Sequence, residues 1–291
     1  MVTVSENSTT PPAASSSSKR ANLKTRVITA LILMPVFIIL ARLGSWPLLL
    51  LVAAIAVIGL MEYFYLAQGR ETQGSALVGV PLGLVVIYLF YIDQPQWSLV
   101  ALGVGAVATF ILEQARHPTE YRRSFIQVLT TLVGVLWVAF PLGCLLAIRA
   151  WPGGAHWIFA AIGVSAGTDT LAYVGGLWIG KTPLAPVLSP KKTREGAAVG
   201  MIGGIVIPAV FLAHGGLLNA TTGVMLLAGP IIAMLGDLFE SAVKRYFNVK
   251  DSHLRGFNLF PGHGGVLDRI DSILFVAAYL YIYGLFAGFG G

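Results

Sequence analysis

The sequence has little charge for its length and a single cysteine. Only 11% of its 291 residues are Asp, Glu, Lys or Arg, whereas a soluble domain usually carries about 25%. Hydrophobic residues make up 56% of the chain, and the mean hydropathy is +0.79. A water-soluble fold of this size could not bury so much apolar surface, which argues against a soluble protein. The lone Cys144 excludes an intramolecular disulfide. We therefore predict an all-α, polytopic integral membrane protein.

Nine apolar stretches are each near the ~20 residues that a helix needs to cross a bilayer. Nine spans would place the N-terminus and the C-terminus on opposite sides. With the N-terminus inside, the inner segments hold all but two of the 19 lysines and arginines, the exceptions being Arg42 and Arg149. This bias predicts a cytoplasmic N-terminus and an outer C-terminus. The expected spans are 27–43, 46–67, 75–92, 97–115, 125–149, 156–180, 197–213, 218–243 and 270–289.

The N-terminal residues differ in composition from the rest of the chain. Residues 1–18 are low-complexity and rich in Ser and Thr, a pattern typical of disorder. The basic stretch that follows precedes an apolar run without a small-residue cleavage site, so we interpret the run as an uncleaved first helix. We expect a disordered tail over 1–22, scaffold and lipid-contacting helices over 23–150, and a polar, candidate catalytic region over 151–291.

Carboxylates gather at the inner ends of the last two expected spans. In "GDLFESAVKRY", Asp237, Glu240, Ser241 and Lys244 share one helix face, because residues three and four apart are neighbours. A structural alternative is a helix end with snorkelling cations and carboxylate partners. Hard oxygen ligands so close to a membrane face instead favour Mg²⁺, which proteins hold with one or two carboxylates plus substrate phosphate oxygens. The candidate ligands are Asp237, Asp251, Asp268 and Asp271.

The inner segment 181–196 contains "SPKKTREG" and supplies the opposite charge. Such a density of cations and hydroxyl groups suits a polyphosphate. A plain topology-determining basic loop is the alternative. The candidate phosphate-binding residues are Ser189, Lys191, Lys192, Thr193 and Arg194.

Two acidic residues fall within expected spans. Asp169 and Tyr173 share a face of the glycine-rich span 156–180, and an intramembrane Asp is by default a functional-site hypothesis. A protonated Asp that holds helices together is an equally weighted alternative. Glu62 lies near an inner helix end, and we interpret it as structural.

The segments "SAVKRYFNVKD" and "PGHGGVLDRID" resemble the signature of the phosphatidate cytidylyltransferase (CDP-diacylglycerol synthase) family. The upstream "DTLAYVGGLWIGK" and "SPKKTREG" are also similar to that family, so the resemblance covers residues 165–275. The signature positions are Ser241, Lys244, Arg245, Lys250, Asp251, His263, Gly264, Gly265, Asp268, Arg269 and Asp271.

The resemblance implies that phosphatidate attacks CTP and gives CDP-diacylglycerol and pyrophosphate. It implies Mg²⁺ and suggests a monovalent cation such as K⁺ beside it, with Asp237 and Asp268 as primary metal ligands and Asp271 and Asp251 as secondary ones. The other catalytic candidates are Lys244, Arg245, His263 and Arg269. The substrate-binding candidates, beside the "SPKKTR" residues, are Ser241, Lys250, Asp169, Tyr173, Gly264 and Gly265.

The expected partners are CTP and bilayer phosphatidate, without nucleic acid, and we expect a homodimer. The expected location is a membrane, the inner one in a bacterium, with the active site on the cytoplasmic face. Access would require a polar cavity bordered by 156–180, 218–243 and 270–289, with a lateral gap toward lipid. Two rival interpretations remain open: another Mg²⁺-dependent membrane phosphotransferase or prenyltransferase, and an ion-coupled transporter with Asp169 and Asp237 as ion sites.

Overall fold

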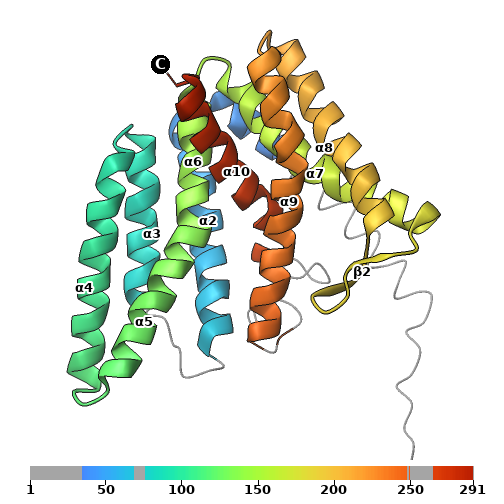
Figure 1. Cartoon of the computed structure of the whole chain (residues 1–291). Coiled ribbons are helices and arrows are strands. Elements are labelled where there is room, and N and C mark those ends of the chain that lie inside the picture. Colours follow the sequence, from blue (N-terminus) through green and yellow to red (C-terminus); the bar gives the residue numbers. More distant parts are fainter. Residues whose placement is uncertain (1–34, 69–75, 248, 250–264, 291) are drawn as a thin grey trace, which may run out of the picture. The chain divides into compact units, whose positions relative to one another are not determined.

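The structure, a computed structural model, describes residues 35–68, 76–247, 249 and 265–290. Residues from Leu40 onward form one unit, and the account below concerns that unit. It consists of long helices and one small β-hairpin (Figure 1). The α-helices are α2 (Ser45–Gln68), α3 (Ala76–Tyr91), α4 (Ser98–Arg116), α5 (Tyr121–Gly134), α6 (Phe140–Ala150), α7 (Gly154–Ile179), α8 (Arg194–His214), α9 (Ala220–Tyr246) and α10 (Leu267–Ala287).

Eight of the nine expected spans coincide with helices of the described chain. Seven of these are long and apolar enough to cross a membrane, with α5 and α6 forming one continuous span over Tyr121–Ala150. The eighth, α3, has 16 residues and is shorter than the others. The first expected span, 27–43, lies mostly outside the described residues. The chain is therefore a polytopic membrane protein by the length and composition of its helices.

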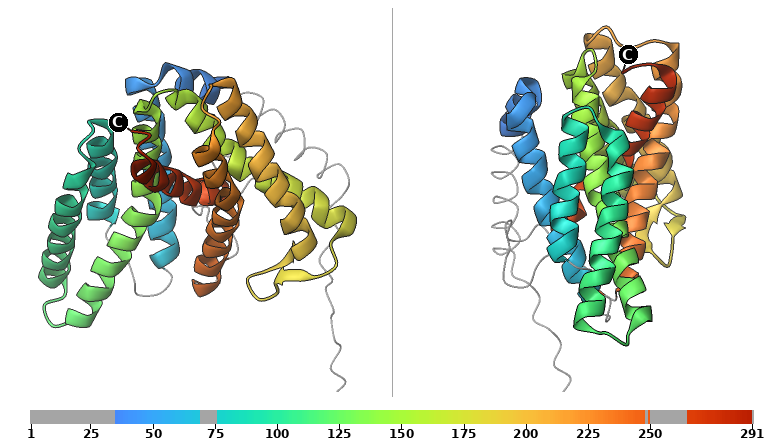
Figure 2. Two further views of the ribbon diagram at one scale, coloured as in Figure 1. Left: turned by 45° about the horizontal axis from the view of Figure 1, so that its top comes forward. Right: turned by 90° about the vertical axis from the view of Figure 1, so that its left-hand side faces the viewer.

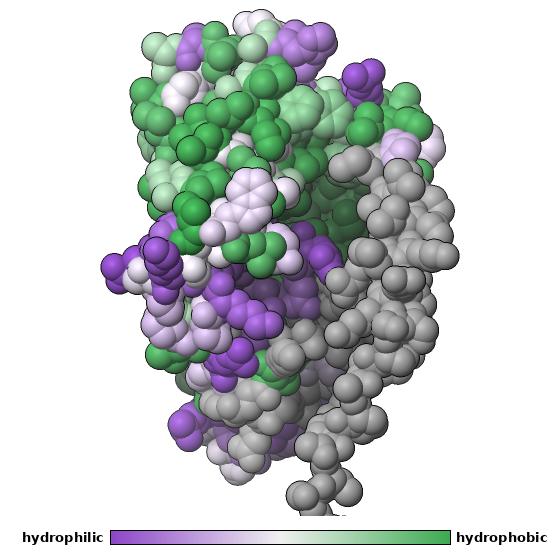
Figure 3. Space-filling model, turned by 90° about the vertical axis from the view of Figure 1, so that its right-hand side faces the viewer, coloured by the Kyte–Doolittle hydropathy of each residue, from purple (hydrophilic) through white to green (hydrophobic). Residues whose placement is uncertain are grey.

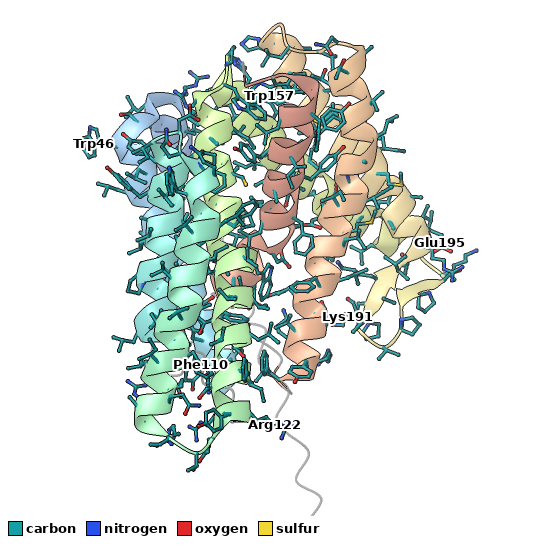
Figure 4. The ribbon with its side chains drawn as sticks, turned by 60° about the vertical axis from the view of Figure 1, so that its left-hand side comes forward. Trp46, Phe110, Arg122, Trp157, Lys191 and Glu195 are labelled. Carbon is teal, nitrogen blue, oxygen red and sulfur yellow. The ribbon has the colours of Figure 1, made fainter. Side chains whose placement is uncertain are left out.

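Successive spans alternate in direction, so the segments between them fall at two ends of the bundle (Figures 1 and 2). One end, here called the polar end, carries the α4–α5 connection, the β-hairpin, the end of α9 and the start of α10. Arg122 and Lys191 lie toward this end in Figure 4, whereas Trp46 and Trp157 lie toward the opposite end. Among the described residues, the basic segments 116–123, 181–194 and 244–245, which were predicted to share one side, thus lie at one end of the bundle.

Helices α7 and α8 pack unusually closely because glycines face one another along their contact. A Cβ atom added to Gly167 would lie 2.6 Å from the carbonyl oxygen of Gly203, and one added to Gly203 would lie 2.4 Å from that of Gly167. Nearer the polar end, a Cβ on Gly196 would lie 2.6 Å from the carbonyl oxygen of Ala172. Small residues of this kind let membrane helices approach backbone to backbone. The pair forms one wall of the site described below.

A two-stranded antiparallel sheet departs from the predicted all-α fold. Strands β1 (Pro183–Ala185) and β2 (Ser189–Thr193) join α7 to α8, in the register Pro183↔Thr193 and Ala185↔Ser189. The Thr193 side chain caps α8 by accepting a hydrogen bond from the Gly196 N–H (3.1 Å). The Glu195 carboxylate accepts two more from the backbone at the start of the hairpin. These bonds fix the segment that holds the predicted phosphate-binding lysines.

The span α5–α6 is interrupted by a π-helical turn, η2 (Val135–Ala139). Such turns are rare and are frequently found at functional sites. Within it Trp137 is buried, with its ring centroid 5.0 Å from that of Phe239 on α9 and 5.8 Å from that of Tyr63 on α2. The turn therefore brings an aromatic side chain between the N-terminal helices and the helices that carry the polar motifs.

Candidate functional site

A cavity of about 580 Å³ opens beside the hairpin, between α7 and α9. Figure 3 shows the face on this side of the molecule, where hydrophobic residues form a broad upper region and hydrophilic residues gather below it. Most of the exposed cavity wall is apolar, and Tyr173 and Leu177 on α7 are also strongly exposed. The lining residues are Asp169, Ala172, Tyr173, Gly176, Leu177, Leu184, Ser189, Lys191, Lys192, Thr193, Ala197, Met234 and Asp237.

An ion pair between Lys192 and Asp237 crosses this cavity, from the hairpin to α9. Both side chains are partly exposed, 29% and 24% respectively. Asp169 on α7 lies close enough to both to interact with them electrostatically. The cavity wall therefore combines one cation with two carboxylates, and Lys191 and two hydroxyl residues border the same space.

Behind Asp169, a pair of serines links α7 to α10. The Ser272 hydroxyl donates to Asp169 Oδ2 (3.3 Å), and the hydroxyls of Ser272 and Ser165 lie 2.6 Å apart. The neighbouring Asp271 is 7% exposed, and it lies within electrostatic range of Asp237 and Asp169. Three aspartates from three helices thus meet near the base of the cavity.

A second polar cluster lies where α9 ends and α10 begins. Lys244 Nζ donates to Glu240 Oε2 (2.9 Å) and to Asp268 Oδ1 (3.0 Å), and the Gly265 N–H donates to Asp268 Oδ2 (2.9 Å). Glu240 is only 2% exposed. Its carboxyl group also lies beside those of Asp268 and Asp271. The cluster has more carboxylates than cations.

Glu62 on α2 holds the start of α10. Its two carboxylate oxygens accept hydrogen bonds from the backbone N–H groups of Val266 (2.9 Å) and Leu267 (2.8 Å). The first N–H groups of a helix have no partner within the helix, and a carboxylate there also interacts favourably with the helix dipole. Glu62 is 5% exposed. The structural role expected for Glu62 is thus confirmed, and it acts on the helix that carries Asp268 and Asp271.

The donor set fits a hard divalent cation. Oε1 of Glu240 is buried and accepts no hydrogen bond within the described part of the chain, although it lies in a group of carboxylates. A buried carboxylate oxygen without a donor favours a cation as its partner. No three His, Cys, Asp or Glu side chains among the described residues form a ready-made metal site. Mg²⁺ usually takes only one or two protein carboxylates and completes its shell with water and phosphate oxygens.

The structure brings most of the predicted site residues together. Seven of them line the cavity: Asp169, Tyr173, Ser189, Lys191, Lys192, Thr193 and Asp237. Four more belong to the second cluster or contact it: Lys244, Gly265, Asp268 and Asp271. Ser241 lies one turn beyond Asp237 on α9, and Arg194, Arg245 and Arg269 are exposed. Lys250, Asp251, His263 and Gly264 lie outside the described residues.

The predicted border of the cavity was wrong in one respect. Helices α7 and α9 line it as expected, but the third wall is the hairpin with the start of α8, and α10 contributes no lining residue. The reason is that the β-hairpin reaches α9 through the Lys192–Asp237 ion pair, and the sequence analysis did not predict strands in this segment. Helix α10 lies behind Asp169 and reaches it through Ser272.

Sequence reasoning missed several residues of the site. The sequence analysis placed Glu240 on the correct helix face but gave it no role. It did not consider Ser272, which directly follows the predicted ligand Asp271. Glu240 already stood in the predicted stripe of α9, and Ser272 could have been found by extending the stripe of Asp268 on α10, because positions three and four apart share a face. Glu62 carries no such signal, since its partners are more than 200 positions away.

This chain is similar to a family model and to several known proteins. A family model described as "Cytidylyltransferase family" matches residues 24–287. A protein named phosphatidate cytidylyltransferase from Staphylococcus haemolyticus (strain JCSC1435) is 34% identical over 89% of this chain and 98% of its own. Its namesake from Staphylococcus aureus (strain COL) is 31% identical over the same shares. The namesake from Brucella abortus biovar 1 (strain 9-941) is 32% identical over 91% of this chain and 94% of its own.

Proposed function

This chain belongs to the cytidylyltransferase family, and we propose from that membership that it transfers a cytidylyl group from CTP to phosphatidate. In this reaction a phosphate oxygen of phosphatidate attacks the α-phosphorus of CTP. The bond between the α-phosphorus and the α,β-bridging oxygen breaks, and pyrophosphate leaves with the electron pair. The products are CDP-diacylglycerol and pyrophosphate. The observation that carries the proposal is the Lys192–Asp237 pair, set with Asp169 in a cavity beside a lysine-bearing hairpin.

The residues of the cavity suit the nucleotide. The attacking phosphate monoester has a second pKa near 6 and is largely ionised at neutral pH, so a strong general base is not needed. The site has to align two polyanions and offset the charge that develops between them. We assign Lys191 and Lys192 to the triphosphate. When CTP binds, Lys192 exchanges its carboxylate partner for phosphate, and Asp237 becomes available to a cation.

We assign metal binding to Asp237 and Asp268, with Asp271 beside them and Asp251 as a further candidate outside the described residues. Mg²⁺, when bound, would polarise the phosphoryl oxygens and neutralise charge on the leaving pyrophosphate. Before a metal binds, Lys244 holds Asp268 in place, because it bridges this residue to Glu240. A monovalent cation such as K⁺ beside Mg²⁺ is part of the same proposal. Arg245, Arg269 and His263 would donate to phosphate oxygens.

We further propose how the protein sits in the membrane. Nine spans, with the polar end in the cytoplasm, would place CTP on the side where the hairpin lies and the C-terminus on the other side. In a bacterium this membrane is the inner one. The exposed apolar residues Tyr173 and Leu177 border the cavity and suit contact with lipid. A homodimer is also part of the proposal, and the mass of the protein in nanodiscs tests it.

The function is tested with purified protein in nanodiscs, incubated with CTP labelled on the α-phosphorus, phosphatidate and Mg²⁺. We expect labelled CDP-lipid and unlabelled pyrophosphate in equal amounts, and loss of both after chelation of the metal. Asp237→Asn should abolish the product. The matched control is Asp93→Asn, the same chemical change in a turn outside the cavity, where the φ of 57° is one that Asn tolerates. Release of pyrophosphate without labelled lipid would overturn the proposal.

A further inference from the structure

A second cavity, of about 440 Å³, lies between the α5–α6 span and the helices α9 and α10. It shares no lining residue with the cavity beside the hairpin. The cavity is open to the surface of the helix bundle, so an apolar segment can enter it from the side. All its lining residues are apolar or aromatic: Val133, Leu136, Trp137, Phe140, Pro141, Phe239, Leu274, Phe275 and Ala278.

One face of α10 connects this cavity to the polar cluster. Asp268, Asp271, Phe275 and Ala278 follow one another at spacings of three, four and three, so they form a single stripe along the helix. At 1.5 Å per residue the stripe is about 15 Å long. Its first half carries carboxylates and its second half lines the apolar cavity. This order, from polar to apolar along one line, matches a molecule with an anionic head and a hydrocarbon tail.

Helix α9 shows the same change from polar to apolar side chains. Glu240 belongs to the polar cluster, and the preceding residue, Phe239, lines the apolar cavity. The ring centroids of Phe239 and Phe275 lie 5.4 Å apart, so aromatic side chains from both helices stand together beside the carboxylates. Lys244, one turn beyond Glu240, supplies a cation at the polar side.

We propose that this cavity, the acyl pocket, binds one acyl chain of the phosphatidate substrate. The inference rests on the proposed function and names the path by which the lipid reaches the carboxylates. A chain that enters the pocket leaves a bilayer that is equally apolar, so burial adds little affinity. The pocket instead orients the lipid, which brings its phosphate toward Asp268 and Lys244.

Photocrosslinking tests occupancy without any turnover. The wild-type protein in nanodiscs is irradiated with a phosphatidate that carries a diazirine on one acyl chain, and the labelled peptides are identified by mass spectrometry. We expect labels on α9 and α10 at Phe239, Phe275 or Ala278, and their loss when unlabelled phosphatidate is in excess. Labels confined to the lipid-exposed helix α4, or crosslinks to a second copy of the chain through these residues, would overturn the proposal.

Filling the pocket tests its contribution to catalysis. Ala278→Trp should lower kcat/KM for long-chain phosphatidate about tenfold, since misplacing a reacting group by about 1 Å can reduce a rate 100-fold. The KM for CTP and the rate with a water-soluble, short-chain phosphatidate should stay unchanged. Ala108→Trp is the matched control, the same change at an exposed position on α4. Equal losses with long-chain and short-chain lipid would contradict the proposal.

If the wild type forms no CDP-lipid at all but is still labelled on α9 and α10, the proposed function fails while the acyl pocket stands as a lipid site.

Discussion

Replacing Glu62 tests whether a contact between distant helices controls the geometry of the site. In Glu62→Gln one carboxylate oxygen becomes an NH₂ group, so one of the two hydrogen bonds to the start of α10 is lost. A hydrogen bond to a charged group contributes about 1.5–3 kcal/mol when both partners are buried. Loss of the carboxylate charge at the helix N-terminus removes a further ~0.3–1 kcal/mol. The start of α10 should therefore be destabilised by roughly 2–3 kcal/mol.

This free energy converts into a rate if the first turn of α10 must be ordered for catalysis. Every 1.36 kcal/mol corresponds to a factor of ten, so kcat should fall roughly 30- to 160-fold. The KM for CTP should change little, because the hairpin and Lys192 do not depend on Glu62. Backbone amide exchange in the segment that begins at Gly265 should rise in the variant, which a purely chemical role would not produce.

The assay uses wild type, Glu62→Gln and Glu113→Gln side by side, with CDP-lipid formation and hydrogen exchange as the two readouts. Glu113 is a suitable control, because it is 4% exposed, lies near the polar end of α4 and pairs with Arg116 rather than with α10. A kcat of Glu62→Gln within twofold of wild type, with unchanged amide exchange, would refute the reasoning. Equal losses in both variants would show a general effect of buried glutamates.

Three further predictions concern the cavity beside the hairpin and the polar cluster next to it. Asp237→Asn and Asp268→Asn should each lower kcat at least about 100-fold, as expected for loss of one preorganised electrostatic contact; near-normal turnover in Mg²⁺ would exclude them as ligands. Lys191→Ala and Lys192→Ala should each raise the KM for CTP about tenfold, which is the effect of losing one charge-assisted hydrogen bond. Wild-type kinetics in both variants would mean that these lysines only determine membrane topology and do not bind the nucleotide. Gly176→Leu should slow turnover, because even a Cβ there would meet the hairpin at 3.3 Å; an unchanged rate would show that this side of the cavity is not used.

Composition predicted eight spans that coincide with helices, and the charge pattern predicted that the candidate site and the basic segments share one end of the bundle. A hydrocarbon environment leaves the backbone few options, so long apolar runs become helices almost regardless of detail. Asp169 and Asp237 were identifiable for the same reason, since an ionisable group within a span needs a partner. The structure supplies these partners in Ser272 and Lys192.

The remaining features depend on tertiary contacts that leave no local trace. The hairpin segment has prolines at 183, 186 and 190 and lacks an alternating pattern, so its strands could not be recognised from the sequence. The π-helical turn around Trp137 also has no sequence signature here. The contact between Glu62 and α10 joins residues that nothing in the sequence relates. Pairings of this kind follow from packing, which a single sequence does not reveal.

The glycine contact between α7 and α8 determines where this protein can be made more thermostable. Replacing glycine with alanine in a helix ordinarily stabilises a protein by about 0.4–1 kcal/mol, because the unfolded chain becomes less flexible. At Gly167 and Gly203 the added methyl group would collide with a carbonyl oxygen of the opposite helix and push the two helices apart. At Gly103 and Gly223 a Cβ would meet nothing within 4 Å. Replacing glycine with alanine should thus stabilise the protein on α4 and at the start of α9, and destabilise it along the α7–α8 wall that carries the hairpin.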